Sequence, residues 1–109
     1  MKLNGIKDWN IEEMTGYKPL TTFYTDFSIA EKYGEIAIKD TYDTLKKYWC
    51  KDYKYLTELV MVLNWKIWEH YESNDKLARL YNDLWEELDN YAIENLQGEE
   101  LVYFYRTTD

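Results

Sequence analysis

The chain has 109 residues, 46% of them hydrophobic and 18% aromatic, and its formal net charge is −8. This length and composition predict one folded domain over residues 1–109 and argue against disorder. No apolar run is long enough to span a membrane, the N-terminus has no apolar signal-peptide core, and the single Cys50 cannot form an internal disulfide. We therefore expect a cytoplasmic protein that binds neither lipid nor nucleic acid directly.

The negative charge is concentrated in the last third of the chain. Residues 67–109 contain eleven acids and three bases, whereas residues 36–66 contain four acids and six bases. Within the last third, "NDLWEELDNYAIENLQGEE" (82–100) holds seven acids and no Lys or Arg. Such a surface is expected to attract cationic protein surfaces.

The first predicted elements are a loop at residues 15–20 ("TGYKPL") and a helix at Thr22–Tyr33. Gly34 is the expected C-terminal stop of this helix. Ser28 and Glu31 have the spacing of a capping box, which offers an alternative start further along.

A second helix is predicted within residues 35–51, because its apolar residues recur at steps of four, three and four. Those residues are Ile38, Tyr42, Leu45 and Trp49. Cys50 follows near several lysines, which could lower its pKa, but a buried structural thiol is the preferred interpretation.

A third helix is predicted at about residues 53–72, with apolar residues on two sides. One side has Leu56, Leu59, Val60, Leu63 and Ile67, and the other has Met61, Trp65 and Trp68. Two apolar sides predict a central helix that packs between neighbours. His70 is expected at the edge of the core, bonded to a backbone group.

A fourth helix is predicted at about residues 75–97, with Ser73, Asn74 and Asp75 as candidate caps and Gly98 as its end. Its predicted core side contains Leu77, Leu80, Tyr81, Leu84, Leu88 and Tyr91, with Trp85 and Ala92 beside them. The short connection makes it an antiparallel hairpin with the third helix.

The last segment, residues 99–109, has the alternation of a strand at Leu101, Tyr103 and Tyr105. A short helix is favoured, because a lone strand would have no partner. The predicted fold is therefore all-α, a compact bundle of about four helices with a short C-terminal segment.

Few residues are suited to catalysis or metal binding. There is one Cys and one His, whereas a structural zinc site uses four such ligands, and neither a di-iron Glu-x-x-His pair nor a phosphate-binding glycine run is present. We expect no catalytic, cofactor-binding or metal-binding residues, and no enzyme. The only basic cluster with interleaved aromatics is diluted by Asp43 and Asp52; it contains Lys46, Lys47, Lys51 and Lys54.

The candidate partner-binding residues are the seven acids Asp83, Glu86, Glu87, Asp89, Glu94, Glu99 and Glu100. They could form a solvated helix face that aids solubility, or a surface that imitates the phosphate backbone and occupies the Arg and Lys residues of a nucleic-acid reader. Glu94, Glu99 and Glu100 are expected near a helix C-terminus, where acids are slightly unfavourable. This expectation gives mild support to the second interpretation.

Three stretches, "MTGYKPLTTFYTDFSIAEKYG", "YKYLTELVMVLNWKIWEHYE" and "GEELVYFYRTTD", resemble small acidic accessory proteins carried by conjugative elements and prophages of gut bacteria. The resemblance covers most of the chain, but it includes no motif with known chemistry. It implies a protein acting in the bacterial host cell, such as an anti-CRISPR inhibitor of a Cas9-type nuclease.

The leading hypothesis is thus a non-enzymatic inhibitor that binds a basic nucleic-acid-handling protein through its acidic helix face. The alternative is a structural or regulatory interaction module of a phage or conjugative element, for example a homodimer. The abundance of aromatic residues, notably Trp65 and Trp68, motivates this second hypothesis.

Overall fold

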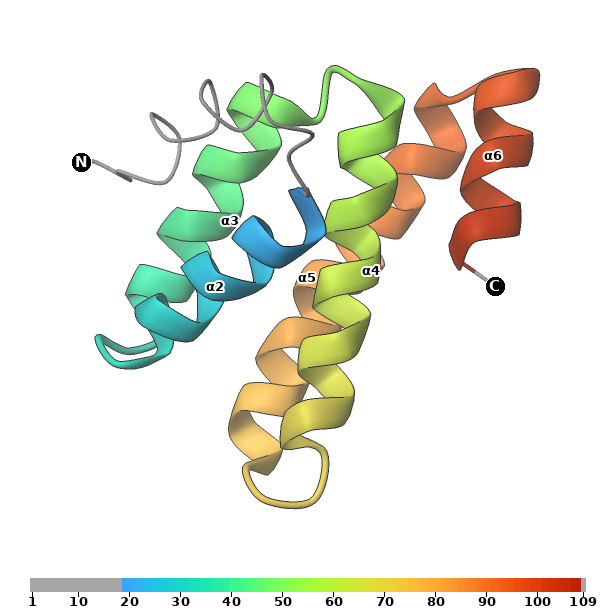
Figure 1. The fold of residues 1–109 in the computed structure, drawn as a ribbon. Coiled ribbons are helices and arrows are strands. Elements are labelled where there is room, and N and C mark those ends of the chain that lie inside the picture. The colour runs from blue at the N-terminus through green and yellow to red at the C-terminus, as the bar shows by residue number, and fades with distance from the viewer. Residues whose placement is uncertain (1–18, 109) are drawn as a thin grey trace.

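The computed structural model describes residues 19–108, which form five α-helices and no strand (Figure 1). The helices are α2 (Pro19–Glu31), α3 (Glu35–Trp49), α4 (Tyr53–His70), α5 (Asp75–Asn95) and α6 (Glu99–Thr108). The all-α prediction is confirmed, but the count of about four helices is too low, because the C-terminal segment forms a complete helix. Within these residues no helix has the length and apolar character needed to cross a membrane.

Local sequence signals account for most of the helix boundaries. The Asp52 carboxylate caps α4 by accepting a hydrogen bond from the Lys54 backbone N–H at 2.8 Å, and the Asn74 side chain caps α5 in the same way. Gly34 separates α2 from α3 at φ 107°, a backbone angle that disfavours other residues. Residues 15–18 of the predicted loop lie outside the described part, and Pro19 opens α2, where a proline is tolerated.

The central position predicted for α4 is confirmed, because α4 contacts each of the other four helices (Figure 1). It forms the predicted antiparallel hairpin with α5. Helices α2 and α3 pack together on one side of the hairpin, and α6 packs against α4 and α5 on the other.

The hydrophobic core lies where these helices meet, and the apolar faces predicted for α3 and α5 supply much of it. The buried core residues of α2 to α5 include Phe23, Phe27, Ile38, Tyr42, Leu45, Leu56, Leu59, Leu63, Leu80, Tyr81, Leu84 and Leu88. Phe104 buries one face of α6. That contact explains why the C-terminal segment is helical despite its strand-like alternation.

One packing prediction is wrong in part. The second apolar side of α4 is only partly covered by the described chain, since Met61 is half-buried but Trp65 is 45% and Trp68 65% exposed. The fully buried apolar residues of α4 are Leu56, Leu59, Val60, Val62 and Leu63. Trp65 and Trp68 therefore form an exposed aromatic surface on the side of α4 that faces away from the core.

Candidate functional site

Helix α5 carries most of the predicted partner-binding acids on its solvent side. Because an α-helix has 3.6 residues per turn, Asp83, Glu87 and Glu94 lie within about 40° of one another around the axis, with Glu86 about 60° from Asp83. Together Asp83, Glu86, Glu87 and Glu94 form what we call the acidic face, and all four are exposed. It extends about 16 Å along the helix.

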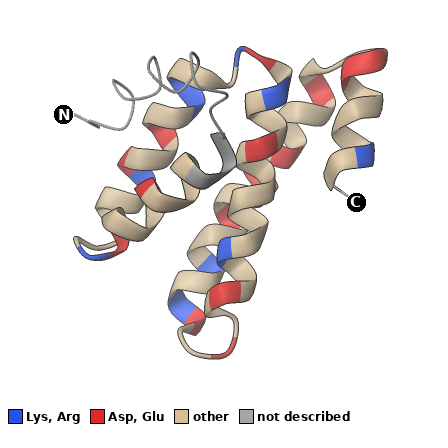
Figure 2. Cartoon of the chain, viewed as in Figure 1, with Lys and Arg blue, Asp and Glu red and all other residues tan. Residues whose placement is uncertain are grey.

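The carboxylates of the acidic face have no cationic partner in the described part of the chain. The ion pairs formed by residues 19–108 involve other acids, for example Arg79 with Asp75 at 2.9 Å and Lys76 with Glu35 at 3.2 Å. Figure 2 shows that the basic residues of α5 lie near its beginning, whereas acidic residues follow along the helix. The charge of this face is therefore not neutralised by neighbouring bases.

The other three predicted acids lie apart from this face. Asp89 is half-buried, about 120° around α5 from Asp83, and burial raises its pKa. Glu99 and Glu100 are exposed in the first turn of α6. Acids are favourable at a helix N-terminus, so their expected position at a helix C-terminus is wrong, and only Glu94 lies near such an end.

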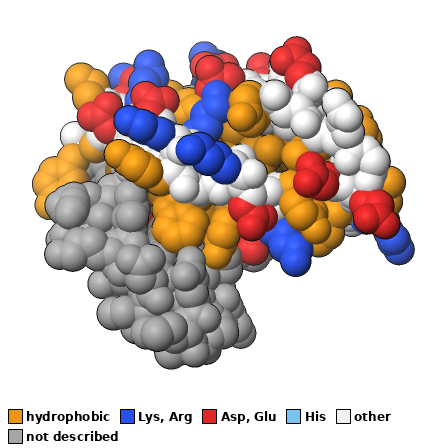
Figure 3. All heavy atoms as spheres, turned by 90° about the horizontal axis from the view of Figure 1, so that it is seen from above, with side chains coloured by type: hydrophobic (Ala, Val, Ile, Leu, Met, Phe, Trp, Pro, Cys, Tyr) orange, Lys and Arg blue, Asp and Glu red, His pale blue; other side chains and the backbone are white. Residues whose placement is uncertain are grey.

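The surface is not uniformly acidic. On the face presented in Figure 3, Lys and Arg side chains lie among Asp, Glu and hydrophobic side chains. Lys46, from the basic cluster noted in the sequence, places its Nζ 4.8 Å from the centre of the Tyr91 ring on α5. The acidic face is thus a local feature of α5.

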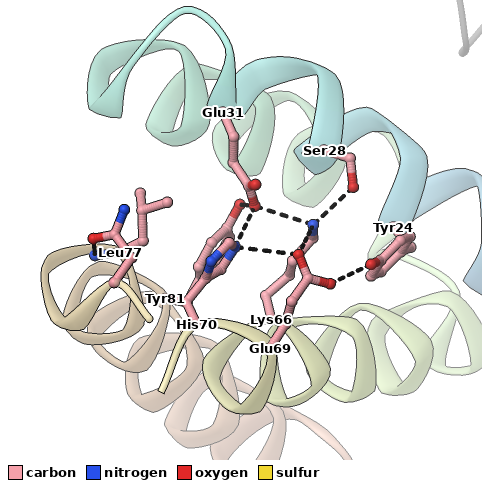
Figure 4. Close-up of polar contacts among 9 residues, drawn as sticks. Tyr24, Ser28, Glu31, Lys66, Glu69, His70, Leu77 and Tyr81 are labelled. Atoms are coloured by element: carbon pink, nitrogen blue, oxygen red, sulfur yellow. Dashed lines mark hydrogen bonds and ion pairs between the residues drawn. The ribbon is translucent and has the colours of Figure 1, made fainter. Parts of the chain in front are cut away.

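A second polar feature, which the sequence did not reveal, joins α2, α4 and α5 around a buried lysine (Figure 4). Lys66 has a side-chain exposure of 0%. Its Nζ lies 2.7 Å from Ser28 Oγ, 3.0 Å from Glu31 Oε2 and 3.2 Å from Glu69 Oε2. These side chains, with Tyr24, His70 and Tyr81, are called the Lys66 cluster below.

Aromatic and imidazole groups complete the Lys66 cluster. The Tyr24 ring lies 4.1 Å from Lys66 Nζ, and its hydroxyl donates to Glu69. Tyr81 donates to Glu31 Oε2 at 2.6 Å, and His70 Nε2 lies 3.0 Å from the same oxygen. The expected backbone partner of His70 is therefore wrong, because two carboxylates from different helices surround its ring nitrogen.

The carboxylates stabilise the buried ammonium, and the cluster in turn shifts the pKa of Glu31. Burial alone would raise the pKa of Glu31, but hydrogen bonds from Tyr81, Lys66 and His70 outweigh it and hold that pKa below its ordinary value. Burial, assisted by the Glu31 carboxylate, raises the pKa of Tyr81. The Lys66 cluster is thus a hydrogen-bonded ion network that ties α2 to the α4–α5 hairpin.

The same cluster brings together three groups with the chemistry of metal ligands. Donor atoms of Glu31, Glu69 and His70 lie within 4.8 Å of one another. However, Lys66 Nζ already lies between the two carboxylates, and its full burial leaves it no solvated position to which it could move. A divalent cation would meet an ammonium at the centre of the site, so we interpret the cluster as structural.

Part of this cluster has a signal in the amino-acid sequence. Lys66 is a base within a long apolar stretch of its helix, with an acid three residues on, and Ser28 and Glu31 share one helix face. The capping-box interpretation of Ser28 and Glu31 is wrong, because both residues lie in the last turn of α2 and contact Lys66. Recognising the cluster required knowledge that α2 packs against α4.

No family model, curated protein or solved structure matches this chain.

Proposed function

We propose that this protein is a non-catalytic binding protein that docks through its acidic face onto a basic surface of a nucleic-acid-handling protein. The observation that carries the proposal is the exposed set of carboxylates on α5, none of which pairs with a Lys or Arg of residues 19–108. Unpaired charges on a rigid helix keep their positions and lose no internal ion pair on binding. They are therefore well suited to meet Arg and Lys residues that otherwise hold phosphates.

The long-range field supports the same partner class. The protein carries a net charge of −8, which repels nucleic acid and accelerates encounter with cationic proteins. Association driven in this way weakens with salt, because exposed charges are screened over about 8 Å at physiological ionic strength.

For the particular partner, we propose a Cas9-type nuclease of the bacterial host, inhibited by a protein from a mobile element. This step depends on the resemblance of the three sequence stretches described above. Nucleases of this type hold guide and target in positively charged channels and read a short flanking motif with Arg side chains. Either surface would accept a compact helix lined with carboxylates.

The chemistry of the two most reactive side chains supports a non-catalytic role. Cys50 is buried, and burial raises the pKa of its thiol to about 12 despite the opposing effect of Lys46. Such a thiol is a poor nucleophile at neutral pH. The imidazole of His70 is held between two carboxylates of the Lys66 cluster.

The test compares two variants with equal charge changes. In the first, Asp83→Asn, Glu87→Gln and Glu94→Gln neutralise three positions of the acidic face. The control variant neutralises three exposed acids elsewhere and contains Asp40→Asn, Asp43→Asn and Glu72→Gln. Inhibition of DNA cleavage by a Cas9-type nuclease is measured for each variant, with circular dichroism confirming that both fold.

We expect the acidic-face variant to lose at least tenfold in inhibitory potency, since each desolvated charge pair contributes about 1 kcal/mol or more. The control should stay within about threefold of the wild type, because its charges act only through the long-range field. Equal potency of the two variants would refute docking through the acidic face. Absence of inhibition by the wild type would refute the choice of nuclease.

A second function is favoured by a separate observation, the exposure of Trp65 and Trp68 on α4. Large exposed aromatics are common anchors of protein interfaces. We propose self-association through this surface as the alternative. Light scattering over a concentration series decides it, because a strict monomer at all concentrations would contradict a homodimer.

A further inference from the structure

The exposed aromatic residues of α4 form a continuous strip. Trp65, Trp68 and Tyr71 follow one another at steps of three, which keeps them on adjacent turns of one helix side. Trp68 and Tyr71 are 65% and 58% exposed, and their ring centres lie 5.4 Å apart. The Trp68 and Tyr71 rings pack at a tilt of 48°, and both remain largely exposed to solvent.

This strip borders the acidic face across a shallow groove of the α4–α5 hairpin. Toward the hairpin turn, Ile67 and Tyr71 line a hollow together with Ala78, Asn82 and Asp83 of α5. A separate hollow further along, lined by Trp65, Trp85 and, from α6, Thr108, contains no carboxylate from the described part of the chain. The groove near the turn thus has the Tyr71 ring on its α4 side and the Asp83 carboxylate on its α5 side, and Trp68 adjoins Tyr71 at its edge.

The charge of the α5 wall is unequal along its length. Arg79 also lines the groove, but it pairs with Asp75 at 2.9 Å. Asp83 has no such partner among residues 19–108, and neither has Glu86, which lies three positions further along the same side. Asp83, which shares a hollow with Tyr71, is therefore the first carboxylate along α5 without a basic partner among residues 19–108.

A flat aromatic ring next to a free carboxylate is the environment that a guanidinium group prefers. Arginine stacks on Trp and Tyr faces and at the same time donates paired N–H groups to a carboxylate. Lysine offers a compact, strongly hydrated charge and gains less from stacking. The protein's own cations already use its rings, since Lys66 and Lys46 lie 4.1 and 4.8 Å from the ring centres of Tyr24 and Tyr91.

We propose that the α4–α5 groove is the docking site for an arginine-presenting segment of the partner protein. Its guanidinium groups stack on Tyr71 and the adjoining Trp68 and pair with Asp83. This inference rests on the proposed function and defines the partner's contact residues as arginine rather than lysine. It also enlarges the binding surface from the acidic face to the aromatic strip.

The test measures binding of a short arginine-rich peptide and of its lysine-substituted counterpart by fluorescence anisotropy. The variant Trp68→Ala/Tyr71→Ala removes two rings of the strip. The control variant Tyr33→Ala/Tyr48→Ala removes two exposed rings from the α2–α3 turn and α3, at 78% and 60% exposure. The triple acidic-face variant described above completes the set.

We expect the wild type to bind the arginine peptide about tenfold more tightly than the lysine peptide, as two cation–π contacts would give. The strip variant should lose this preference, and the control should keep it within about twofold. Arg79 lines the same hollow as Tyr71 and Asp83, and its charge repels an incoming guanidinium. Arg79→Gln should therefore strengthen binding of the arginine peptide.

The outcomes separate this inference from the proposed function. If the strip variant keeps its preference for arginine while the acidic-face variant loses affinity, the groove is not the site, but acidic docking stands. If neither peptide binds the wild type and no variant alters nuclease inhibition, both proposals fail. If sedimentation shows a wild-type dimer that Trp68→Ala/Tyr71→Ala dissociates, the groove binds a second copy and the arginine assignment is overturned.

Discussion

Replacement of the buried Lys66 by methionine tests whether the Lys66 cluster holds α2 against the α4–α5 hairpin. Methionine keeps the apolar stem and removes the charge. It leaves the Glu31 carboxylate, which is 15% exposed, without its ammonium partner at 3.0 Å. Glu69 is 36% exposed and can be hydrated once Lys66 is removed, so the loss of its ion pair with Lys66 costs less stability.

Breaking a buried ion pair by removing one partner costs about 3–5 kcal/mol. Because Glu69 is partly rehydrated, we expect Lys66→Met to lower the free energy of unfolding by about 3 kcal/mol, at the low end of that range. For a domain of this size, the melting temperature should fall by about 12 °C. The double variant Lys66→Met/Glu31→Gln should recover about half of the loss, because no buried charge is then left unpaired.

Urea unfolding followed by far-UV circular dichroism measures these differences, with an unchanged m-value showing that the same surface unfolds. The exposed Lys39→Met is the matched control on α3 and should change stability by less than about 0.5 kcal/mol. A loss below about 1 kcal/mol for Lys66→Met, or no recovery in the double variant, would refute the buried ion network.

Three further predictions concern the ionisable groups Glu31, Glu58 and Cys50. The pKa of Glu31 is lowered in the folded protein. The stability that Glu31 contributes is therefore present above the ordinary value of 4.5 and is lost as the pH falls through the folded pKa. In thermal melts between neutral and acid pH, the melting temperature of Glu31→Gln should fall less steeply toward acid than that of the wild type. Burial, and to a lesser extent the Asp52 charge, raises the pKa of Glu58. Glu58→Gln should therefore increase the free energy of unfolding near neutral pH, and this increase should vanish in acid. An increase that grew in acid would contradict a raised pKa of Glu58. The Cys50 thiol, with its pKa raised to about 12, should react with Ellman's reagent at least ~100-fold more slowly in the folded protein than in urea, and comparable rates would show that it is accessible.

The helical fold could be predicted because its signals are local. The repeat of Leu80, Leu84 and Leu88 on one side of a helix requires only the 3.6-residue period. The cap at Asn74 and the turn at Gly34 require only the chemistry of single residues. The C-terminal segment was ambiguous because its two-residue alternation competes with the three-residue step from Leu101 to Phe104, and burial of Phe104 decides between them.

The features that depend on which helices touch could not be predicted. Lys66 reads as a surface lysine until α2 brings Ser28 and Glu31 beside it. In the same way, Trp65 and Trp68 have the hydrophobicity of core residues, and only the arrangement of the bundle leaves them exposed. The acidic face was visible in the sequence because its acids share one helix, whereas its proximity to the aromatic strip was not.

Hydrogen exchange of the protein alone and in complex with a Cas9-type nuclease is the most direct test of acidic docking. We predict that binding slows amide exchange in α5 over residues 83–94, and in α4 over residues 65–71. Exchange in α3 should be unchanged. Protection confined to α2 and α3, with α5 exchanging as in the free protein, would contradict the account.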